Sequence, residues 1–399
     1  MSDARSNPQP AASSNPSAVG SSAKLSAMTL TGGGARGAYQ VGFLRGLARN
    51  IPEERLDFQL LTGVSAGAIN TAFLAARKSS FAAAVEDLVR LWSGLTFDKV
   101  FQVDATCLGR NVLRWGVRLV SGGARGAPSV RGLLDTIPLR QLLSKTLRPT
   151  NGVIEEIDAN LSQGRLRAVA LTSLNYATGQ TVTWIQGCEL DSWERANRCG
   201  VKTQITVDHV MASAALPLIF PAVELEGGWY GDGGIRMYTP LAPAIHLGAD
   251  TILAISTRYP RSRAEASRQV ISGYPPPAQV AGVLLNAIFL DAIEQDAYRL
   301  ERINGLLSLI PSHQSRGLRP IRLLTPRPSR DLGRLAADYE SKLPRAFRFL
   351  TRGLGTRETS SPDFLSLLMF QPDYLRQLIE IGEADAENCL DEIHQLLDS

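Results

Sequence analysis

Residues 58–67 read Phe-Gln-Leu-Leu-Thr-Gly-Val-Ser-Ala-Gly, and an alanine-rich segment follows them. The apolar first half predicts a buried strand, and the segment 66–78 predicts a helix. The pattern Gly-x-Ser-x-Gly between them is typical of a tight strand-to-helix turn that holds a serine hydroxyl beside the free N–H groups of the helix. Ser65 is therefore a candidate nucleophile, with Gly63 and Gly67 as the small residues that let the turn close.

Strand and helix patterns alternate along the chain as far as residue 256. Short apolar runs predict strands at 27–31, 58–62, 166–173, 180–185 and 251–256. Helical periodicity predicts helices at 66–78, 81–92, 133–147 and 208–215. We expect Asp208 to cap the last of these helices. The alternation predicts an α/β fold with a mostly parallel central sheet and helices on both faces.

The C-terminal part of the chain has a different pattern. Residues 259–278 are rich in Pro, Ser and Arg, which predicts a linker or a mobile loop. Residues 279–399 are predicted to be mainly helical, with a periodic segment at 280–309 and one more strand at 321–324. We therefore expect a catalytic unit at 24–258, followed by a helical extension that serves as a lid or as a membrane-facing surface.

Charge is nearly balanced over the 399 residues, with a formal net charge of +4. This value gives no reason to expect nucleic acid as a partner. Arginines dominate from residue 316 to residue 357, and acidic residues dominate after Asp373. Such segments are usually solvated helical faces. The sharper alternative is a basic surface for anionic lipid headgroups.

The cysteines give no sign of a disulfide framework or of a metal site. They lie far apart in the chain, at Cys107, Cys188, Cys199 and Cys389. No C-x-x-C pair is present, so we expect no metal and predict free thiols in a reducing compartment. A bridge between Cys188 and Cys199 is left open by this reasoning.

The first residues of the chain do not have the arrangement of segments that is typical of a secretion signal. Residues 1–23 are rich in Ser, Ala, Pro and Asn, without a basic segment followed by an apolar one, and they are predicted to be a disordered leader. The longest apolar candidate for a membrane span, 211–223, is interrupted by Pro217 and Pro221. We expect a cytoplasmic protein whose contact with membranes is peripheral.

Residues 32–37, Gly-Gly-Gly-Ala-Arg-Gly, follow the first predicted strand. One interpretation is an oxyanion hole, because glycines let backbone N–H groups face a developing negative charge. Gly32, Gly34 and Gly37 also satisfy the dinucleotide pattern G-x-G-x-x-G. The acidic residue expected about twenty positions later is Asp57, but it precedes the next strand instead of ending it. This placement argues against a nucleotide-binding oxidoreductase.

A serine nucleophile needs a proton acceptor, and histidine is the usual one. The chain has four histidines, at His209, His246, His313 and His394. The sequence favours a carboxylate, because Gly231-Asp232-Gly233-Gly234 places an acid in a tight turn with little side-chain cover. Taken alone, this motif is also good chemistry for an ordinary hairpin turn.

The three motifs together resemble those of the patatin-like phospholipase family in their order and spacing. The stretch 212–221, Ala-Ser-Ala-Ala-Leu-Pro-Leu-Ile-Phe-Pro, is similar to that family as well. The resemblance covers residues 25–256 and implies a three-layer α/β/α sandwich. It also implies a catalytic dyad that needs no histidine, with Ser65 as the nucleophile and Asp232 as the proton acceptor.

The resemblance further implies a set of residues around that dyad. The oxyanion hole would comprise Gly32, Gly33, Gly34, Arg36 and Gly37, and the Asp-Gly-Gly motif is completed by Gly233 and Gly234. We expect the Arg36 side chain to brace the turn rather than to contact phosphate, because the carbonyls of the turn need partners. The implied activity is hydrolysis of lipid esters, phospholipids first, without a cofactor. The alternative is a catalytically silent lipid-binding or scaffolding protein on the same fold, against which the intact motifs argue.

Overall fold

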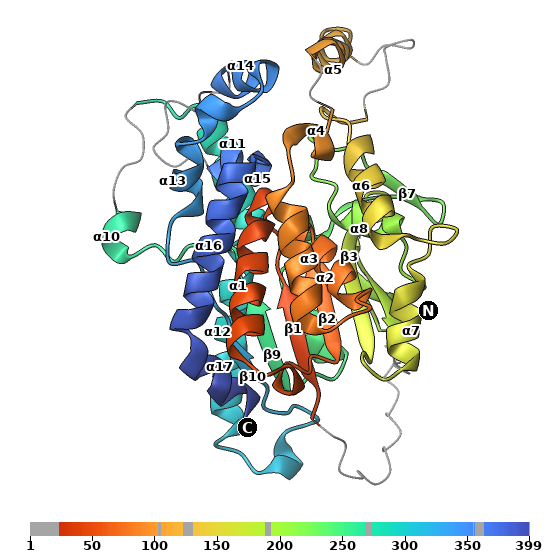
Figure 1. Cartoon of the computed structure of the whole chain (residues 1–399), viewed down its shortest axis with the longest axis vertical. Helices are drawn as coiled ribbons and strands as arrows, with labels where there is room; N and C mark the ends of the chain where they lie inside the picture. Colours follow the sequence, from red (N-terminus) through yellow and green to blue (C-terminus); the bar gives the residue numbers. More distant parts are fainter. Residues whose placement is uncertain are drawn as a thin grey trace, which may run out of the picture.

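The computed structural model describes residues 24–102, 105–122, 131–187, 193–267, 273–353, 355 and 363–398. The expected leader, the side chain of Cys107 and all of Cys188 lie outside this description. In the described part, one large sheet carries helices on both faces, so the predicted three-layer α/β class is confirmed (Figure 1).

The sheet has ten strands in the described part, most of them close to the predicted positions. They are β1 (Ser26–Leu30), β2 (Leu60–Val64), β3 (Ala168–Asn175), β4 (Thr181–Gly187), β5 (Glu194–Arg195), β6 (Arg198–Lys202), β7 (Val223–Leu225), β8 (Gly228–Asp232), β9 (Thr251–Ile255) and β10 (Arg322–Leu324). The order is β10-β9-β1-β2-β3-β4-β6-β5, and β8 pairs with β3 and β7. The run from β10 to β3 is parallel, whereas β4 and β8 are antiparallel to β3.

Helices surround this sheet and form most of the C-terminal part. They are α1 (Gly37–Asn50), α2 (Ala66–Ala75), α3 (Phe81–Ser93), α4 (Phe97–Val100), α5 (Ala105–Val120), α6 (Ile137–Leu147), α7 (Glu155–Ser162), α8 (Val207–Ser213), α9 (Ala242–His246), α10 (Arg263–Ala266), α11 (Pro277–Phe289), α12 (Ala292–Leu307), α13 (Leu332–Ala337), α14 (Arg345–Gly353), α15 (Asp363–Leu368), α16 (Pro372–Asn388) and α17 (Leu390–Leu397). Two short 3-10 turns, η1 (Gly34–Arg36) and η3 (Gly233–Arg236), follow β1 and β8.

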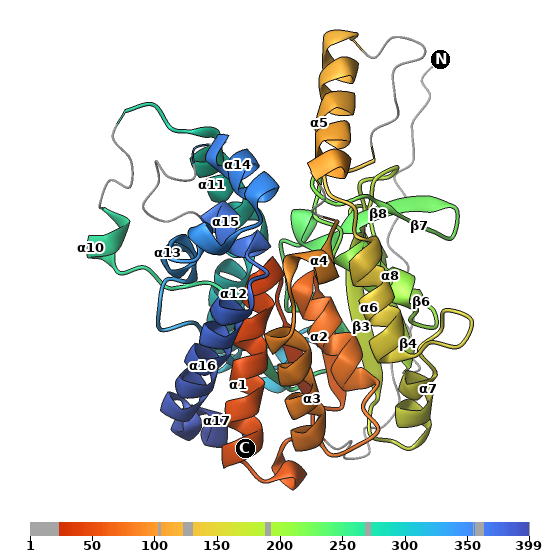
Figure 2. The same ribbon diagram turned by 45° about the horizontal axis from the view of Figure 1, so that its top comes forward.

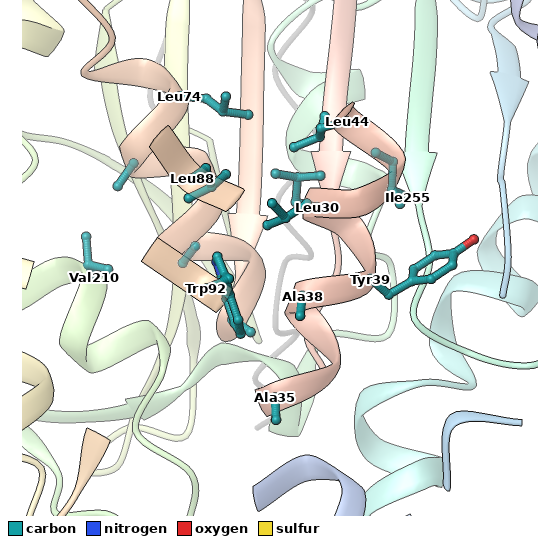
Figure 3. Packing of buried hydrophobic residues seen from close by; sticks show 14 of the residues in the cluster. Leu30, Ala35, Ala38, Tyr39, Leu44, Leu74, Leu88, Trp92, Val210 and Ile255 are labelled. Atoms are coloured by element: carbon teal, nitrogen blue, oxygen red, sulfur yellow. The ribbon is translucent and has the colours of Figure 1, made fainter. Parts of the chain in front are cut away.

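The two faces of the sheet bury two separate hydrophobic clusters, because successive side chains of a strand point to opposite faces. In β1, Met28 belongs to the larger cluster and Ala27 to the smaller one. The larger cluster lies under α1, α2, α3 and α16, and Figure 3 shows Leu30, Leu44 and Ile255 close together in it. The smaller cluster lies under α9 and α12. The alternation fixes which strand residues face each layer of helices.

The start of α8 differs from the prediction. Thr206, not Asp208, is the N-cap residue, and its hydroxyl accepts a hydrogen bond from the N–H of His209. The ring of His209 accepts a hydrogen bond from the Thr206 N–H in return, at 3.1 Å. Asp208 instead forms an ion pair with Arg140. The reciprocal pair satisfies two N–H groups at once, and Asp208 lies too far inside the helix to compete for them.

The periodic segment 280–309 forms two helices, α11 and α12, which are separated at Leu290 and Asp291. By length and composition alone, Pro277–Leu307 could cross a membrane, whereas the sequence analysis gave 211–223 as the longest apolar candidate. Only 28% of its most apolar window is buried in the protein. Phe289 and Ile293 are among its buried residues, and through them the segment packs on the rest of the fold.

The C-terminal part packs directly onto the sheet and its helices. β10 pairs with β9 and bears out the strand expected at 321–324. Helix α16 lies along α1 (Figure 1), so closely that a Cβ added to Gly42 would overlap the carbonyl oxygen of Ile379. A division into a catalytic unit and a separate helical extension stays a prediction.

Candidate active site

Ser65 stands at the junction of β2 and α2, where the Gly-x-Ser-x-Gly pattern predicts it. Its backbone has φ 57° and ψ −129°, a conformation that costs energy for a residue with a side chain. The turn is tight because Gly67 lies against the end of β1, where a Cβ would overlap the carbonyl oxygen of Leu30. Gly63 lies in the same way against Thr71 of α2. The Ser65 side chain is thereby held, buried, at the carboxyl end of the parallel strands.

Ser213 holds the backbone of this strained turn. The N–H of Ser65 donates to the Ser213 hydroxyl oxygen at 3.1 Å, and that hydroxyl donates to the carbonyl of Thr172 at 2.6 Å. Two residues further on, the carbonyl of Ala215 accepts the N–H of Asp232 at 3.0 Å. The end of α8 therefore fixes the backbones of both Ser65 and Asp232. The sequence analysis missed this contribution, and the only signal was the family-like stretch that contains Ser213.

Asp232 ends β8 and is completely buried. Its Oδ1 accepts a hydrogen bond from the N–H of Gly234 at 2.9 Å. Its Oδ2 has no hydrogen-bond partner of regular geometry among the described residues, although the Ser65 hydroxyl lies close enough to favour the charged carboxylate. Burial raises the pKa of Asp232 from 3.8 to about 7, while the Ser65 hydroxyl and the Gly234 N–H limit the rise. A carboxyl group in this state can accept a proton from a neighbouring serine.

The glycine turn that connects β1 to α1 passes beside Ser65. A Cβ added to Gly32 would lie 3.1 Å from the Cβ of Ser65. Gly34 has φ 55°, a value that glycine adopts without strain. The N–H groups of Gly33, Gly34 and Ala66 donate to no backbone acceptor in the part of the chain that the structure describes. Backbone N–H groups without an acceptor are the kind of group that binds a developing negative charge in serine hydrolases.

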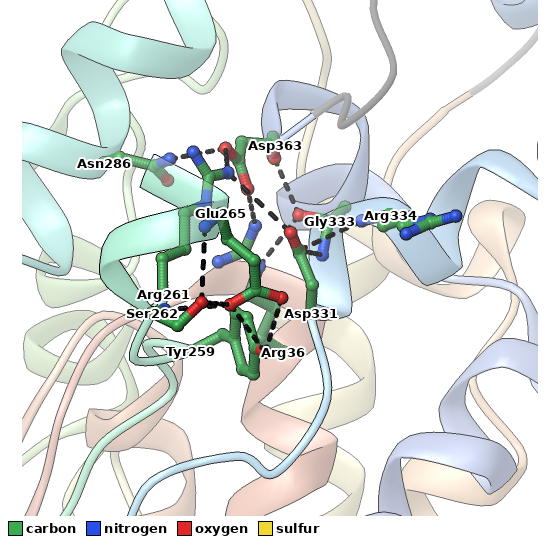
Figure 4. A network of polar contacts seen from close by, with 11 residues as sticks. Arg36, Tyr259, Arg261, Ser262, Glu265, Asn286, Asp331, Gly333, Arg334 and Asp363 are labelled. Carbon is green, nitrogen blue, oxygen red and sulfur yellow. Dashed lines mark hydrogen bonds and ion pairs between the residues drawn. The ribbon is translucent and has the colours of Figure 1, made fainter. Parts of the chain in front are cut away.

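The Arg36 side chain is bound to α15 (Figure 4). It is only 3% exposed, its Nε donates to the Ser366 hydroxyl at 2.8 Å, and its Nη2 pairs with Asp363 at 2.6 Å. Its backbone N–H donates to the carbonyl of Gly33 at 3.0 Å. Gly37, the next residue, begins α1 and leaves no room for a side chain beside Trp92. These contacts agree with a bracing function for the Arg36 side chain.

A narrow apolar cavity opens from Ser65 between the helices on the same face of the sheet. Its walls are formed by apolar side chains of α2, α3 and α6 and of the segment that follows α8, among them Ile69, Leu91, Trp92, Leu139, Leu143 and Phe220. The cavity is narrow, since the space open to the centre of a water-sized sphere is only about 30 Å³. On the other side, Phe289 of α11 packs directly on Gly234 and also lies near Gly32.

The four histidines make their contacts elsewhere. His209 caps α8, the ring of His246 stacks on Trp193 with the ring centres 4.6 Å apart, and His394 lies 2.8 Å from Arg55. His313 is exposed beside Gln314. None of these contacts joins a histidine to Ser65, so the structure offers no triad in the described residues.

The remaining alternatives from the sequence find little support in the structure. Asp57 accepts a hydrogen bond from Gln59 before β2 begins, far from the carboxyl end of the sheet. The side chains of Cys199 and Cys389 are free thiols. Among the described residues, no group of three or more His, Cys, Asp or Glu side chains is arranged to hold a metal ion.

The sequence model of the family described as Patatin-like phospholipase matches residues 28–245. This range includes the glycine turn, the Ser65 turn and the Asp-Gly-Gly motif. The chain therefore belongs to the patatin-like phospholipase family. Among the curated proteins, no sequence matches it.

Several solved structures are similar in fold, at low identity. VipD from Legionella pneumophila has 13% identity and a TM-score of 0.38, covering 92% of this chain and 67% of VipD. Human GIVD cytosolic phospholipase A2 has 12% identity and a TM-score of 0.45, with 94% and 60% covered. The type III effector ExoU has 13% identity and a TM-score of 0.38, with 92% and 53% covered. The chain thus spans about half to two thirds of the length of these proteins.

Proposed function

We propose that the protein is a serine acyl hydrolase that cleaves ester bonds of lipids, phospholipids first, through Ser65 and Asp232. The observation that carries the proposal is the pairing of a strained, buried serine with a buried carboxylate whose Oδ2 is unoccupied. Membership of the patatin-like phospholipase family supports the same chemistry. No cofactor takes part in the proposed reaction.

In the first half of the reaction, Asp232 accepts the Ser65 hydroxyl proton as Oγ attacks the ester carbonyl. The carbonyl oxygen becomes an oxyanion, which the N–H groups of Gly33, Gly34 and Ala66 stabilise. When the tetrahedral intermediate collapses, the C–O bond to the alcohol breaks and Asp232 returns the proton to the departing oxygen. The lysolipid or alcohol leaves, and the acyl group stays on Ser65.

In the second half, Asp232 accepts a proton from water, whose oxygen attacks the acyl carbonyl. The same N–H groups bind the second oxyanion, and collapse releases the fatty acid and restores the Ser65 hydroxyl. A base with a pKa of about 7 suits both steps, because it can take a proton near neutral pH and give it back. Each oxyanion donor contributes about 3–4 kcal/mol to such reactions.

The apolar cavity beside Ser65 is the proposed site for the acyl chain. Its side chains offer contact to hydrocarbon and almost no polar group, which fits a fatty acyl group better than a polar one. We expect the protein to reach such substrates by peripheral contact with a lipid surface. Residues 24–258 would carry the chemistry, and the C-terminal helices would cover it.

A fluorophosphonate probe tests the nucleophile, because it reacts with activated serines. We expect the native protein to be labelled and the Ser65→Ala variant to be unlabelled, with exposed Ser79→Ala as the matched control. Labelling that survives in Ser65→Ala would refute the assignment of Ser65. Absence of labelling in the native protein would favour the silent lipid-binding alternative.

Asp232→Asn tests the base. The variant is expected to fold, because the Asn side chain has nearly the same shape, and to lose esterase activity by about 100-fold or more. Turnover of a soluble short-chain ester is the measurement. Turnover near that of the native protein would point back to one of the histidines.

A further inference from the structure

Three helices lie at the end of the molecule where β1 and β2 lead into the glycine turn and Ser65, with α5 apart from the other two. They are α5, α11 and α14, and both views place them at the same end (Figures 1 and 2). We call their outward surface the docking face. It is defined by exposed apolar residues, namely Val112, Leu113, Val117 and Val120 of α5, Val280, Val283 and Leu284 of α11, and Phe349 of α14.

Helix α5 stands out from the body of the protein (Figure 2). Its arginines, Arg110, Arg114 and Arg118, are four residues apart and therefore lie along one side of the helix. Leu113, 67% exposed, and Val120 lie on another side. The helix contains no acidic residue. A helix that exposes basic and apolar side chains and has no acidic residue is typical of the interface of an anionic membrane.

Helix α14 repeats the same chemistry. Exposed Arg345 accompanies Phe349, which is 83% exposed, and the helix has no acidic residue. Of the other two arginines, Arg348 donates to the carbonyl of Ser341 and Arg352 pairs with Glu340. Phe347, two positions earlier, is buried in the core. One side of α14 therefore anchors the helix to the protein, while Phe349 is presented to the outside.

Helix α11 belongs to the docking face on its outer side and contacts the site on its inner side. It contains no charged residue from 277 to 289. Gly282 and Phe289 face the protein, where Phe289 packs on Gly234, while Val283 and Leu284 are exposed. An uncharged helix with an exposed apolar side thus lies directly above the Asp-Gly-Gly motif.

We propose that the docking face binds the surface of an anionic lipid bilayer and so brings Ser65 to its substrate. The proposal deepens the proposed function and rests on it for the identity of the substrate. Arg114 of α5 and Arg345 of α14 contact lipid phosphates, while the exposed apolar side chains enter the headgroup region. A second copy of the chain is a poorer occupant, because a symmetric contact would bring these arginines against each other.

Flotation of the full chain with lipid vesicles tests the docking face. Neutral phosphatidylcholine vesicles are compared with vesicles that also contain an anionic phospholipid. We expect binding to the anionic vesicles, and a loss of at least about tenfold in Leu113→Glu/Val117→Glu, since acidic residues are repelled by the anionic surface. Arg114→Gln/Arg345→Gln should weaken binding most at low salt.

The matched control is Leu318→Glu. Leu318 is 58% exposed and precedes β10, at the opposite end of the sheet, so this variant should bind like the native protein. Hydrolysis of a soluble short-chain ester should be unchanged in all variants. If the native protein does not hydrolyse this ester, the proposed function is refuted, but the docking face is not. Equal binding by native protein and both double variants, or no preference for anionic vesicles, would overturn the proposal. A dimer that Leu113→Glu/Val117→Glu dissociates would overturn it in favour of self-association.

Discussion

The chemistry of the site depends on the solvation of a single carboxyl group. Burial disfavours the charged form of Asp232, whereas the Gly234 N–H and the Ser65 hydroxyl favour it, and the balance is a pKa of about 7. Most aspartates at protein surfaces are much weaker bases. The buried position therefore gives a carboxylate the proton affinity that serine hydrolases usually obtain from histidine.

The rate of ester hydrolysis is predicted to follow the charge of Asp232. Only the carboxylate can accept the Ser65 proton, so kcat/KM should rise with pH up to about 7 and level off above it. Below that pH, we expect a decrease of about tenfold per pH unit. A pH series with a soluble ester checks this, and a rate that stays constant down to pH 5 would contradict it.

The pH dependence of the stability of Asp232→Asn gives an independent test of the raised pKa of Asp232. Native Asp232 keeps its proton up to a pH of about 7, whereas in the unfolded chain it loses the proton near 3.8. Its contribution to the free energy of unfolding therefore decreases as the pH rises between these values. Asparagine does not titrate, so the stability of the variant relative to native protein should increase over this range, by an amount on the order of 4 kcal/mol.

Helices α1 and α16 approach each other closely at Gly42, and a substitution there tests this contact. Gly42→Ala would place a methyl group on the backbone carbonyl of Ile379, which cannot move without shifting the helix. We expect the free energy of unfolding to decrease by about 3 kcal/mol or more. Chemical denaturation is the measurement.

Gly116→Ala is the control for this substitution. Gly116 lies in α5 and has nothing within 4 Å of an added Cβ. Alanine should stabilise the helix there by about 0.5–1 kcal/mol, because glycine loses more backbone entropy on folding. Equal effects of the two substitutions would show that α1 and α16 are not in close contact.

The sequence predicted those elements whose signal is local. The strand–glycine–serine pattern placed Ser65 correctly, although β2 begins two residues later than the apolar run does and continues to Val64. The role of Ser213 could not be predicted, since its partners Ser65 and Thr172 are 148 and 41 positions away. The break at Asp291 was missed for a similar reason, because the helical periodicity continues across it.

In the molecule as a whole, the C-terminal helices contact the elements that position the site. α15 packs on η1, which is part of the glycine turn, and α16 lies along α1. The pair of Arg36 and Asp363 joins the two regions, and Asp363 also accepts hydrogen bonds from Asn286 at 2.6 Å and Arg261 at 3.3 Å (Figure 4). One largely buried carboxylate thus connects the turn next to Ser65 with segments that come more than 200 residues later in the chain.

Asp363→Asn is predicted to weaken both stability and activity. Removing the carboxylate leaves the buried guanidinium of Arg36 uncompensated, a change that costs about 3–5 kcal/mol in buried ion pairs. The glycine turn should then lose its fixed position, so kcat for a soluble ester should decrease even at temperatures where the variant is folded. The matched control is Asp373→Asn, whose pairs with Lys342 and Arg376 are exposed, and which should leave the free energy of unfolding almost unchanged. If Asp363→Asn behaves like that control in both measurements, the C-terminal helices cover the turn without holding it.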